Sequence, residues 1–388
     1  MNKCIFKLND ICDISGGYAF KSTIFKDNGI PIIRIGDISD NKINISETTV
    51  YINENIEKYK NFIISKGDIL IALSGATTGK FGIYNYDEPS LLNQRVAKLF
   101  PKKDVLNKYL YHYMNKLQDT IYNKALGCAQ PNISPKEIGE LEIYLPNINE
   151  QKAIVEVLDK AQELIDKRKK QIEALDELVK SKFIEMFGDP ITNPINWEKK
   201  KLAEECNIIT GNTPPRKVGE YYGDYIEWIK SDNITDDGIY LTKAREYLSE
   251  EGLKVGRSVE ENSILMTCIA GSIKCIGNVA IANRKVTFNQ QINGIEPLKN
   301  NVYFMFEQFN LSQKYIQSTI NMSLKGILSK GQLSELEFIF PPIEKQNEFA
   351  EFFKQVDKLK FEMEKSLKEL EDNFNSLMQK SFKGELFK

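Results

Sequence analysis

Two short segments of the chain come close to catalytic motifs, and neither completes one. The segment Gly75-Ala76-Thr77-Thr78-Gly79-Lys80 resembles a phosphate-binding loop, but it has three residues between its glycines and Phe81 after the lysine. Such a loop needs four residues there, and a Ser or Thr after the lysine to hold a metal ion. We expect a hairpin turn, with a backbone contact to a nucleic-acid phosphate as the functional alternative.

The second segment, Thr213-Pro214-Pro215-Arg216, resembles the Pro-Pro motif of enzymes that methylate base amino groups. Those enzymes carry Asp, Asn or Ser before the prolines and an aromatic ring after them, so this segment lacks both the polar group and the stacking ring. It is more typical of a rigid loop. Carboxylates are plentiful, but no spaced pair recurs in the two halves of the chain. We therefore predict no catalytic residue.

Histidine and cysteine chemistry is also unsupported. The single histidine, His112, lies in an aromatic helical turn and has no counterpart later in the chain, so we interpret it as a packed or surface residue. The six cysteines show no CxxC spacing, so neither a zinc site nor a disulfide framework is suggested. We expect small buried side chains in a reducing compartment, no metal, and no cofactor held by this chain.

Recognition chemistry fits the chain better than catalysis. Arg and Lys pair with guanine edges, and Asn and Gln pair with adenine edges, in the DNA major groove. Candidates lie near predicted strand ends and loops: Arg34, Lys80, Gln94 and Arg95 early in the chain, and Arg216, Lys217, Lys274, Gln290 and Gln291 later. A solvated surface role is the alternative for each. Tyr18, Tyr222 and Trp228 are more typical of core or rim positions.

The elements that must position these residues occur twice. Lys7-Leu8-Asn9-Asp10-Ile11-Cys12 is answered by Lys201-Leu202-Ala203-Glu204-Glu205-Cys206, and Leu145-Pro146 by Phe340-Pro341. Each half is rich in β-branched, strand-like runs. These are 30–35, 68–73, 80–84 and 92–96 in the first half, and 225–230, 263–268, 276–281 and 288–292 in the second. A helical stretch follows in each, at 105–124 and 302–319. The repeat therefore predicts two small α+β domains built on one plan.

Each half then closes with a long helix that has a 4-3 apolar pattern. The first seam is Ile154, Leu158, Ala161, Ile165, Arg168, Ile172, Leu175 and Val179, and this helix should end at Phe187-Gly188-Asp189-Pro190. The second seam is Phe349, Phe353, Val356, Lys360, Met363, Leu367, Leu370, Phe374 and Leu377. The pattern predicts a coiled coil, because about 40 residues at ~1.5 Å each exceed the width of a small domain. Packing of each helix on its own domain is the alternative.

Composition limits the partners. The chain has 388 residues, 41% of them hydrophobic, and a net charge of −2. No apolar run approaches the ~20 residues of a membrane span, and the first residues lack a signal-peptide core, so we expect a cytoplasmic protein that does not enter membranes. A basic domain is the usual mark of a nucleic-acid binder, so any grip on DNA must come from local patches or from a partner protein.

Taken together, these residues resemble the DNA-specificity subunit of type I restriction-modification systems. The resemblance covers the whole chain. It is sharpest at Leu145–Val155, at its weaker twin Phe340–Ala350, and at Ala129-Gln130-Pro131-Asn132-Ile133-Ser134. The paired cores Arg34-Ile35-Gly36-Asp37-Ile38 and Lys230-Ser231-Asp232-Asn233-Ile234 also carry it.

The resemblance implies an α+β fold with two pseudo-twofold-related α/β target-recognition domains, separated by an antiparallel coiled coil of two long helices. The corresponding segments are a first target-recognition domain at 1–146, a first spacer helix at 147–189, a second domain at 190–341 and a second spacer helix at 342–388. The resemblance also adds Gln130 and Asn132 to the DNA-binding candidates. The second half has Leu324-Lys325-Gly326-Ile327 there, so we do not expect a shared base contact.

Each domain would read one half of a split site on double-stranded DNA, and the helices would set the spacer. The expected partners are two adenine-N6 methyltransferase subunits, optionally with two restriction subunits. S-adenosylmethionine is then expected on the methyltransferase, and ATP and Mg on a restriction partner. The alternatives are a self-sufficient DNA-modification enzyme, which S-adenosylmethionine binding would reveal, and a tandem-domain coiled-coil protein scaffold.

Overall fold

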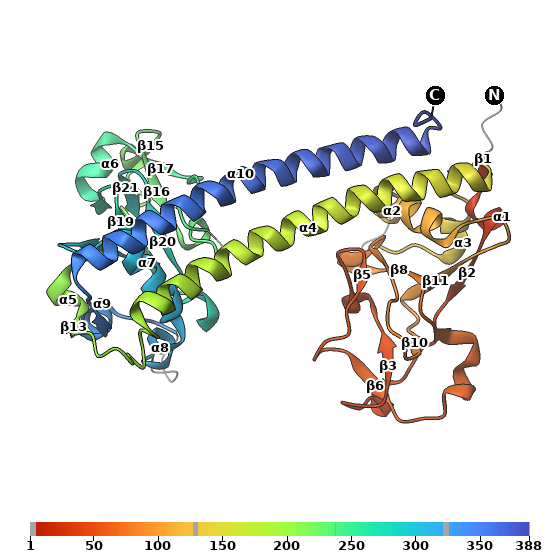
Figure 1. Cartoon of the computed structure of the whole chain (residues 1–388), viewed down its shortest axis with the longest axis horizontal. Coiled ribbons are helices and arrows are strands. Elements are labelled where there is room, and N and C mark those ends of the chain that lie inside the picture. The colour runs from red at the N-terminus through yellow and green to blue at the C-terminus, as the bar shows by residue number, and fades with distance from the viewer. Residues whose placement is uncertain (1–4, 127–130, 237, 321–325, 388) are drawn as a thin grey trace. The chain divides into compact units, whose positions relative to one another are not determined.

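The computed structural model describes residues 5–126, 131–236, 238–320 and 326–387. Its contacts divide the chain into two compact units (Figure 1). Unit 1 comprises residues 1–169 and 365–388, and unit 2 comprises residues 170–364. The division falls inside the two long helices, so each unit holds part of both. The sequence suggested these helices as separate segments, whereas the contacts group their parts with the globular domains.

Unit 1 is built on two small sheets. The six-stranded sheet has the order β2 (Cys12–Gly16), β11 (Val96–Pro101), β8 (Ile69–Ala72), β9 (Phe81–Ile83), β5 (Lys42–Ile43) and β4 (Ile38–Ser39). The four-stranded sheet has the order β6 (Val50–Ile52), β3 (Ile30–Ile33), β10 (Ser90–Leu92) and β7 (Ile63–Ile64). The strand β8 is buried along its whole length, which explains its unbroken apolar sequence.

Helices and a terminal strand pair complete unit 1. The strand β1 (Ile5–Lys7) pairs antiparallel with β12 (Glu142–Tyr144), and α1 (Leu8–Ile11) follows it. The helices α2 (Asn107–Ala125) and α3 (Pro135–Gly139) contribute buried apolar residues to one core with α4 and the six-stranded sheet. In Figure 1, α2 and α3 lie beside the first turns of α4.

Unit 2 repeats this plan. Its first sheet has the order β14 (Cys206–Thr210), β22 (Ile292–Pro297), β19 (Ser263–Thr267) and β20 (Val279–Ala282). Its second has the order β15 (Tyr222–Gly223), β17 (Tyr247–Leu248), β16 (Ile226–Ile229), β21 (Val286–Phe288) and β18 (Ser258–Val259). The strand β13 (Lys199–Lys201) pairs with β23 (Glu337–Ile339). The helices are α5 (Leu202–Glu205), α6 (Glu250–Val255), α7 (Val302–Leu311), α8 (Gln313–Ser318) and α9 (Lys330–Glu335).

Local details recur at a nearly constant shift along the chain. The ion pair Lys7–Glu140 (2.5 Å) has its counterpart in Lys201–Glu335 (2.6 Å). Both α3 and α9 begin with a capping box, formed by Ser134 with Glu137 and by Ser329 with Gln332. The two units therefore share local chemistry as well as topology.

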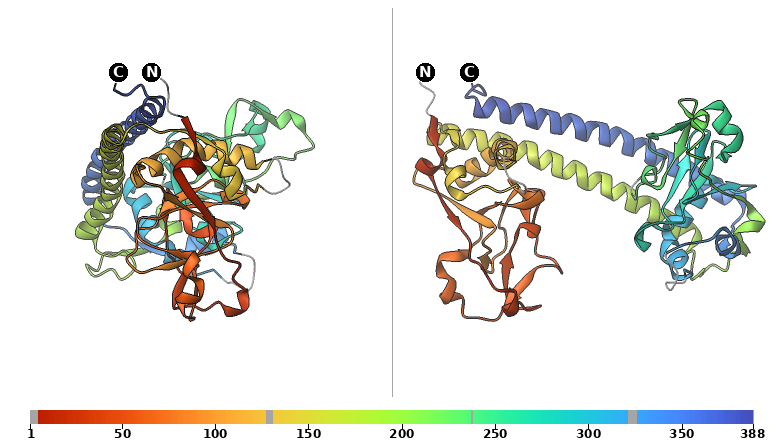
Figure 2. Two further views of the ribbon diagram at one scale, coloured as in Figure 1. Left: turned by 90° about the vertical axis from the view of Figure 1, so that its right-hand side faces the viewer. Right: turned by 180° about the vertical axis from the view of Figure 1, so that it is seen from behind.

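The long helices α4 (Ile148–Phe187) and α10 (Ile343–Phe382) pack antiparallel within each unit (Figure 2). In unit 1, the early α4 residues Ile154, Leu158 and Ile165 share a core with the late α10 residues Phe374 and Phe382. In unit 2, the late α4 residues Leu175 and Val179 share a core with the early α10 residues Phe353 and Val356. Ile172, Met363, Leu367 and Leu370 are half-buried.

Polar residues also join the two helices. Lys169 pairs with Glu371 at 3.0 Å in unit 1, and the predicted seam intruder Lys360 pairs with Asp176 at 2.6 Å in unit 2. The helix α4 ends where the sequence predicted, since Gly188 adopts a left-handed φ of 75° directly after Phe187. The predicted α+β fold with two repeated domains and antiparallel long helices is confirmed.

Three local predictions were wrong. The runs 92–96 and 288–292 are turns between two strands, because their central Asn side chains cap the turn instead of extending the backbone. The helical stretch 302–319 is interrupted at Ser312, between α7 and α8. Cys275 is exposed, although Cys12, Cys206 and Cys268 are buried as expected.

Candidate nucleic-acid interface

The turn between β10 and β11 presents two of the predicted reading residues. Asn93 holds this turn: its side-chain oxygen accepts from the Arg95 amide at 3.3 Å, and its own amide donates to the Ile33 carbonyl at 3.2 Å. The Gln94 amide donates to the Tyr18 carbonyl at 2.9 Å. The side chains of Gln94 and Arg95 are exposed. The turn is therefore fixed by backbone hydrogen bonds and by the Asn93 side chain, and the Gln94 and Arg95 side chains remain exposed.

Hydrogen bonds join this turn to the neighbouring loops of unit 1. The Leu73 amide donates to the Arg95 carbonyl (2.8 Å), and the Ile133 amide donates to the Leu73 carbonyl (2.9 Å). The loop 73–80, which carries Lys80, is thereby tied to the segment 131–133, which carries Asn132. Both side chains are exposed. Gln130 lies outside the described residues.

Arg34 belongs to the same group of loops, but its polar groups form hydrogen bonds within its own domain. It precedes the 3-10 turn η2 (Ile35–Asp37), and its backbone amide donates to the Asp37 carboxylate at 2.7 Å. Its guanidinium donates to the Thr48 carbonyl at 2.6 Å. Thus the structure brings the loops of all five described candidates of unit 1 together, although Arg34 is half-buried.

The corresponding turn of unit 2 uses the same bonds. The Asn289 side-chain oxygen accepts from the Gln291 amide at 3.1 Å, and the Asn289 amide donates to the Ile229 carbonyl at 3.0 Å. A Cβ at Gly211 would clash with the Asn289 carbonyl, as a Cβ at Gly17 would with Asn93. These two glycines are required by close backbone approach.

The side chains on this second turn are more engaged than those on the first. Gln290 is exposed and accepts a hydrogen bond from the Thr213 hydroxyl. Gln291 is half-buried, and its side-chain oxygen accepts from the Asn289 amide group at 3.0 Å. Gln290 is therefore better placed than Gln291 to contact a ligand.

The loop that carries Lys274 is tied to this turn in the same way. The Cys268 amide donates to the Gln291 carbonyl (2.8 Å), and the Leu328 amide donates to the Cys268 carbonyl (2.9 Å). Ile327 forms an isolated β-bridge with Ile269, and this bridge corresponds to the one between Asn132 and Ser74 in unit 1. The expected departure is therefore a substitution of Ile for Asn at one structural position.

A charged aromatic cluster in unit 2 went unnoticed in the sequence. The Arg216 guanidinium lies over the rings of Tyr222 (4.6 Å) and Trp228 (5.0 Å), and Lys230 lies over Trp228 at 5.1 Å. Glu246 bonds to both cations, at 2.7 Å from Arg216. Arg34 and Lys230 occupy matching positions in the sequence repeat, so the sequence could have identified Lys230 as a candidate. It could not have identified Glu246, because the pairing of β16 with β17 brings that residue to the cluster.

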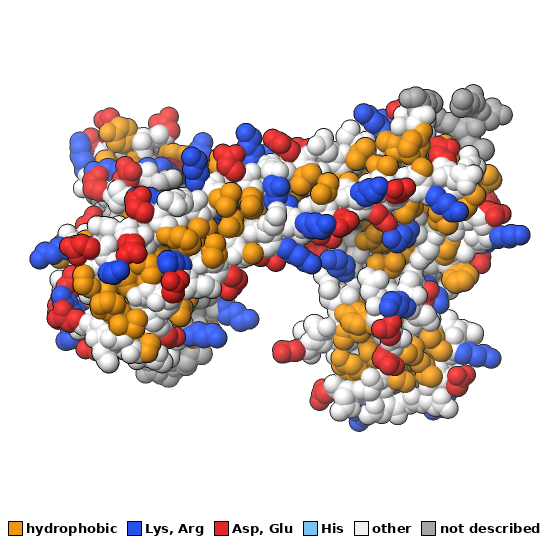
Figure 3. Space-filling view, viewed as in Figure 1, with side chains coloured by type: hydrophobic (Ala, Val, Ile, Leu, Met, Phe, Trp, Pro, Cys, Tyr) orange, Lys and Arg blue, Asp and Glu red, His pale blue; other side chains and the backbone are white. Residues whose placement is uncertain are grey.

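The cations among the candidate residues are of two kinds: those paired with Glu246 and those that form no ion pair with a described residue. The Lys230 ammonium, with further help from Arg216, holds the pKa of Glu246 below its ordinary value in spite of burial, which would raise it. Arg216 and Lys230 therefore already have a counter-ion. Lys80, Arg95, Lys217 and Lys274 are exposed and form no ion pair with any described residue. In the face shown in Figure 3, basic and acidic side chains intermix over both units.

Tyr18 is a second residue whose role the sequence did not reveal. It is 42% exposed, beside the Gln94 turn, and its ring packs edge-on against Phe20 at 5.0 Å. Such a ring, fixed on one side and open on the other, can stack on a base.

The described residues contain no group of three or more His, Cys, Asp or Glu side chains arranged to hold a metal ion. None of the described helices combines the length and apolar character that crossing a bilayer needs. Two repeated units, each presenting exposed amide and cationic side chains from interlocked loops, define a two-domain recognition protein.

Comparisons with known proteins identify the family to which this two-domain recognition protein belongs. The family model for the type I restriction modification DNA specificity domain matches residues 2–176 and again 194–372. The EcoBI type I specificity subunit of Escherichia coli is 25% identical over 98% of this chain and 85% of its own length. The MjaVIII specificity subunit of Methanocaldococcus jannaschii is 31% identical over 45% of this chain and 43% of its own length.

Solved structures share the fold. The S subunit from M. genitalium aligns with a TM-score of 0.55 and 17% identity, over 97% of this chain and 95% of that chain. A chain from another type I restriction-modification system aligns with a TM-score of 0.59 and 16% identity, over 98% of both chains. The chain belongs to the type I restriction-modification DNA specificity family and is a specificity subunit with two target-recognition domains.

Proposed function

We propose that each unit reads one half of a bipartite site on duplex DNA through its interlocked loops, and that the chain itself carries out no chemistry. The observation that supports this most directly is the repetition of the same turn, with Gln94 and Arg95 in one unit and Gln290 at the matching place in the other. Amide and guanidinium groups at fixed turns are what base-edge recognition needs.

In this proposal, α4 and α10 hold the two reading domains at a fixed spacing and provide docking surfaces for two adenine-N6 methyltransferase subunits. Systems that cleave DNA add two restriction subunits. S-adenosylmethionine then binds the methyltransferase, and ATP and Mg bind the restriction subunit. The net charge of −2 supports a need for partners, because acidic side chains intermix with the basic ones over both units and offset their attraction for phosphates.

A footprint on duplex DNA tests the reading assignment. The chain reconstituted with its methyltransferase should protect two patches and leave the middle unprotected. The double variant Gln94→Ala/Arg95→Ala should lose sequence-specific protection of one patch and keep the other. Lys103→Ala, which removes an exposed cation outside these loops, is the matched control. One continuous patch, or loss of both patches in the double variant, would reject the proposal.

The absence of chemistry is tested separately. The purified chain with S-adenosylmethionine should transfer no methyl group to DNA, whereas the reconstituted complex should methylate adenine. Methyl transfer by the chain alone would assign it to the self-sufficient enzymes instead.

A further inference from the structure

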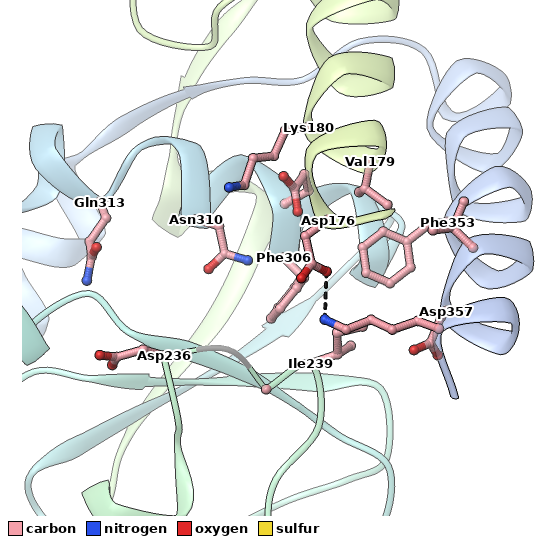
Figure 4. Close-up of a pocket in the computed structure, with 14 residues that line it drawn as sticks. Asp176, Val179, Lys180, Asp236, Ile239, Phe306, Asn310, Gln313, Phe353 and Asp357 are labelled. Atoms are coloured by element: carbon pink, nitrogen blue, oxygen red, sulfur yellow. Dashed lines mark hydrogen bonds and ion pairs between the residues drawn. The ribbon is translucent and has the colours of Figure 1, made fainter. Parts of the chain in front are cut away.

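Unit 2 contains a cavity of about 390 Å³ that the DNA-reading proposal does not use. It is lined by α4, α7, α10 and the loop that carries Asp236 and Ile239 (Figure 4). None of the reading candidates lines it. Its volume falls at the lower end of the ~300–1,000 Å³ range of small-ligand sites.

The walls combine an apolar floor with an excess of negative charge. Val179, Phe306, Phe353 and Val356 provide apolar surface. The charged lining consists of four carboxyl groups and two ammonium groups: Asp176, Asp236, Glu307 and Asp357, with Lys180 and Lys360. The lining therefore carries a net charge of −2 when every group is ionised, from −4 and +2.

Three of the four carboxylates already have partners. Asp176 pairs with Lys360 at 2.6 Å, Asp357 accepts from the Tyr240 hydroxyl at 3.0 Å, and Asp236 accepts from the Asn278 amide. Lys180 pairs with Glu177, outside the lining, at 2.8 Å. The lysines are thus directed to other acidic groups.

Glu307 is only partly satisfied, because Asn310 hydrogen-bonds to its carboxyl group while one of the two oxygens has no described partner. It is 5% exposed, and its Oε1 has no hydrogen-bond partner among the described residues. An unpaired buried oxygen destabilises the folded state, so its presence here calls for an explanation. When Glu307 is ionised, the partner of this oxygen must be a hydrogen-bond donor, and the surplus negative charge of the lining favours a cationic one.

We propose that this cavity binds a small aliphatic diamine or polyamine. One ammonium group donates to the Glu307 carboxylate, the methylene stem lies against Phe306, Phe353 and Val356, and a second ammonium lies near Asp236. A flexible alkyl stem suits a wall that is apolar between charged groups. The ligand class differs from the DNA and protein partners proposed above.

Proton release gives this proposal a second readout. Burial raises the pKa of Glu307 to about 7, although Lys180 and Asn310 act to lower it. A bound ammonium group favours the ionised carboxylate, so binding should release a proton near pH 7 and tighten as the pH rises. The charged groups that face Glu307 or share its cavity are Asp176, Glu177 and Lys180 on α4, Asp236 on the loop, and Asp357 and Lys360 on α10.

Calorimetry of the full chain with putrescine and spermidine tests the site. We expect saturable binding to one site per chain, tighter at pH 8 than at pH 6, with a heat that depends on the ionisation enthalpy of the buffer. Glu307→Gln should weaken binding at least about tenfold and abolish the proton release. Glu185→Gln makes the same change at an exposed position of α4 outside the lining and should bind as the unmodified chain does.

Circular dichroism should show that the Glu307→Gln variant is folded, because Gln has nearly the same size as Glu and costs less to bury. Three outcomes would overturn the proposal. These are no saturable binding of either amine, equal binding by Glu307→Gln, and binding that Glu185→Gln weakens as much. Each would leave the DNA footprint unaffected, so this inference and the proposed function fail independently.

Discussion

His112 and Glu307 occupy the same place in the two copies, 195 residues apart, on α2 and on α7. Both are buried, and each has a polar atom without a partner among the described residues: His112 Nδ1 and Glu307 Oε1. The repeat therefore keeps a buried titratable group at this position while changing its type. The two units should respond to pH in opposite directions.

Unit 1 should lose stability in acid. His112 Nε2 contacts Asp159 at 2.7 Å, and burial lowers the pKa of His112 below 6.5 although Asp159 acts to raise it. Since the unfolded chain takes up the proton first, stability falls as the pH drops below about 6.5. The protection factors of the α2 amides, corrected for the intrinsic pH dependence of hydrogen exchange, should fall between pH 7 and 5.5, and His112→Gln should reduce that change. An unchanged pH response in the variant would contradict this explanation.

Unit 2 should lose stability in base. The pKa of Glu307 is raised by burial from 4.5 to about 7, so the folded state retains its proton where the unfolded state does not. Stability should therefore fall as the pH rises from 4.5 through 7. In amine-free buffer, the protection factors of the α7 amides, corrected for the intrinsic pH dependence of exchange, should fall from pH 6 to pH 8, and Glu307→Gln should flatten the profile. A variant that remains as sensitive as the original chain would show that another group is responsible.

At the scale of elements, one glutamine anchors the start of each long helix. The Gln151 side chain is 1% exposed, accepts from the Leu106 amide at 2.9 Å, and donates to the carbonyls of Asp104 and Pro146. Gln346 likewise accepts from the Asn301 amide and donates to the Pro341 carbonyl, and its third bond goes to the Asn300 side-chain oxygen instead of a backbone carbonyl. The repeated motif that ends in these glutamines therefore attaches each long helix to its domain by buried hydrogen bonds.

Removing the hydrogen bonds of Gln151 should destabilise unit 1. Gln151→Met keeps a similar volume but leaves buried backbone groups unpaired, so we expect a loss of about 2–4 kcal/mol. Urea denaturation followed by a probe in unit 1 measures it. Gln379→Met, at an exposed position of α10, is the control and should change stability by less than about 0.5 kcal/mol. Equal effects of the two substitutions would show that the bonds of Gln151 matter little.

The helix pair also makes a prediction about spacing. One heptad inserted after Lys169 in α4 and another after Glu364 in α10 would add ~10 Å to each helix. If the helices set the spacer, the unread segment should lengthen by ~3 base pairs or binding should be abolished, with both half-site preferences retained. Site selection from random duplexes measures the spacer. An unchanged spacer with full affinity would show that the helices do not set the length of the unread segment.

The sequence predicted these elements because apolar periodicity and repetition are local properties. It failed at 92–96 and 288–292, where apolar neighbours gave Asn-Gln turns the appearance of strands. It also missed the cluster around Trp228, since Arg216 and Glu246 are 30 residues apart and meet only through the fold. Which loops interlock depends on long-range backbone bonds, such as that from Leu73 to Arg95, that no local pattern encodes.

For the whole molecule, duplication supplies two readers and leaves each free to differ. The backbone scheme is common to both units, whereas the exposed side chains are Gln94 and Arg95 in one and Gln290 in the other. Two different half-sites can therefore be read by one architecture. One unit should therefore be exchangeable without a change in the half-site that the other unit reads.

Exchange of residues 1–145 for the corresponding domain of a relative tests that claim most directly. The hybrid is assembled with its methyltransferase, and the methylated adenine motif is read by sequencing. One half of the bipartite motif should change while the other half and the spacer remain as they were. A change in both halves, or in neither, would contradict the assignment of one half-site to each unit.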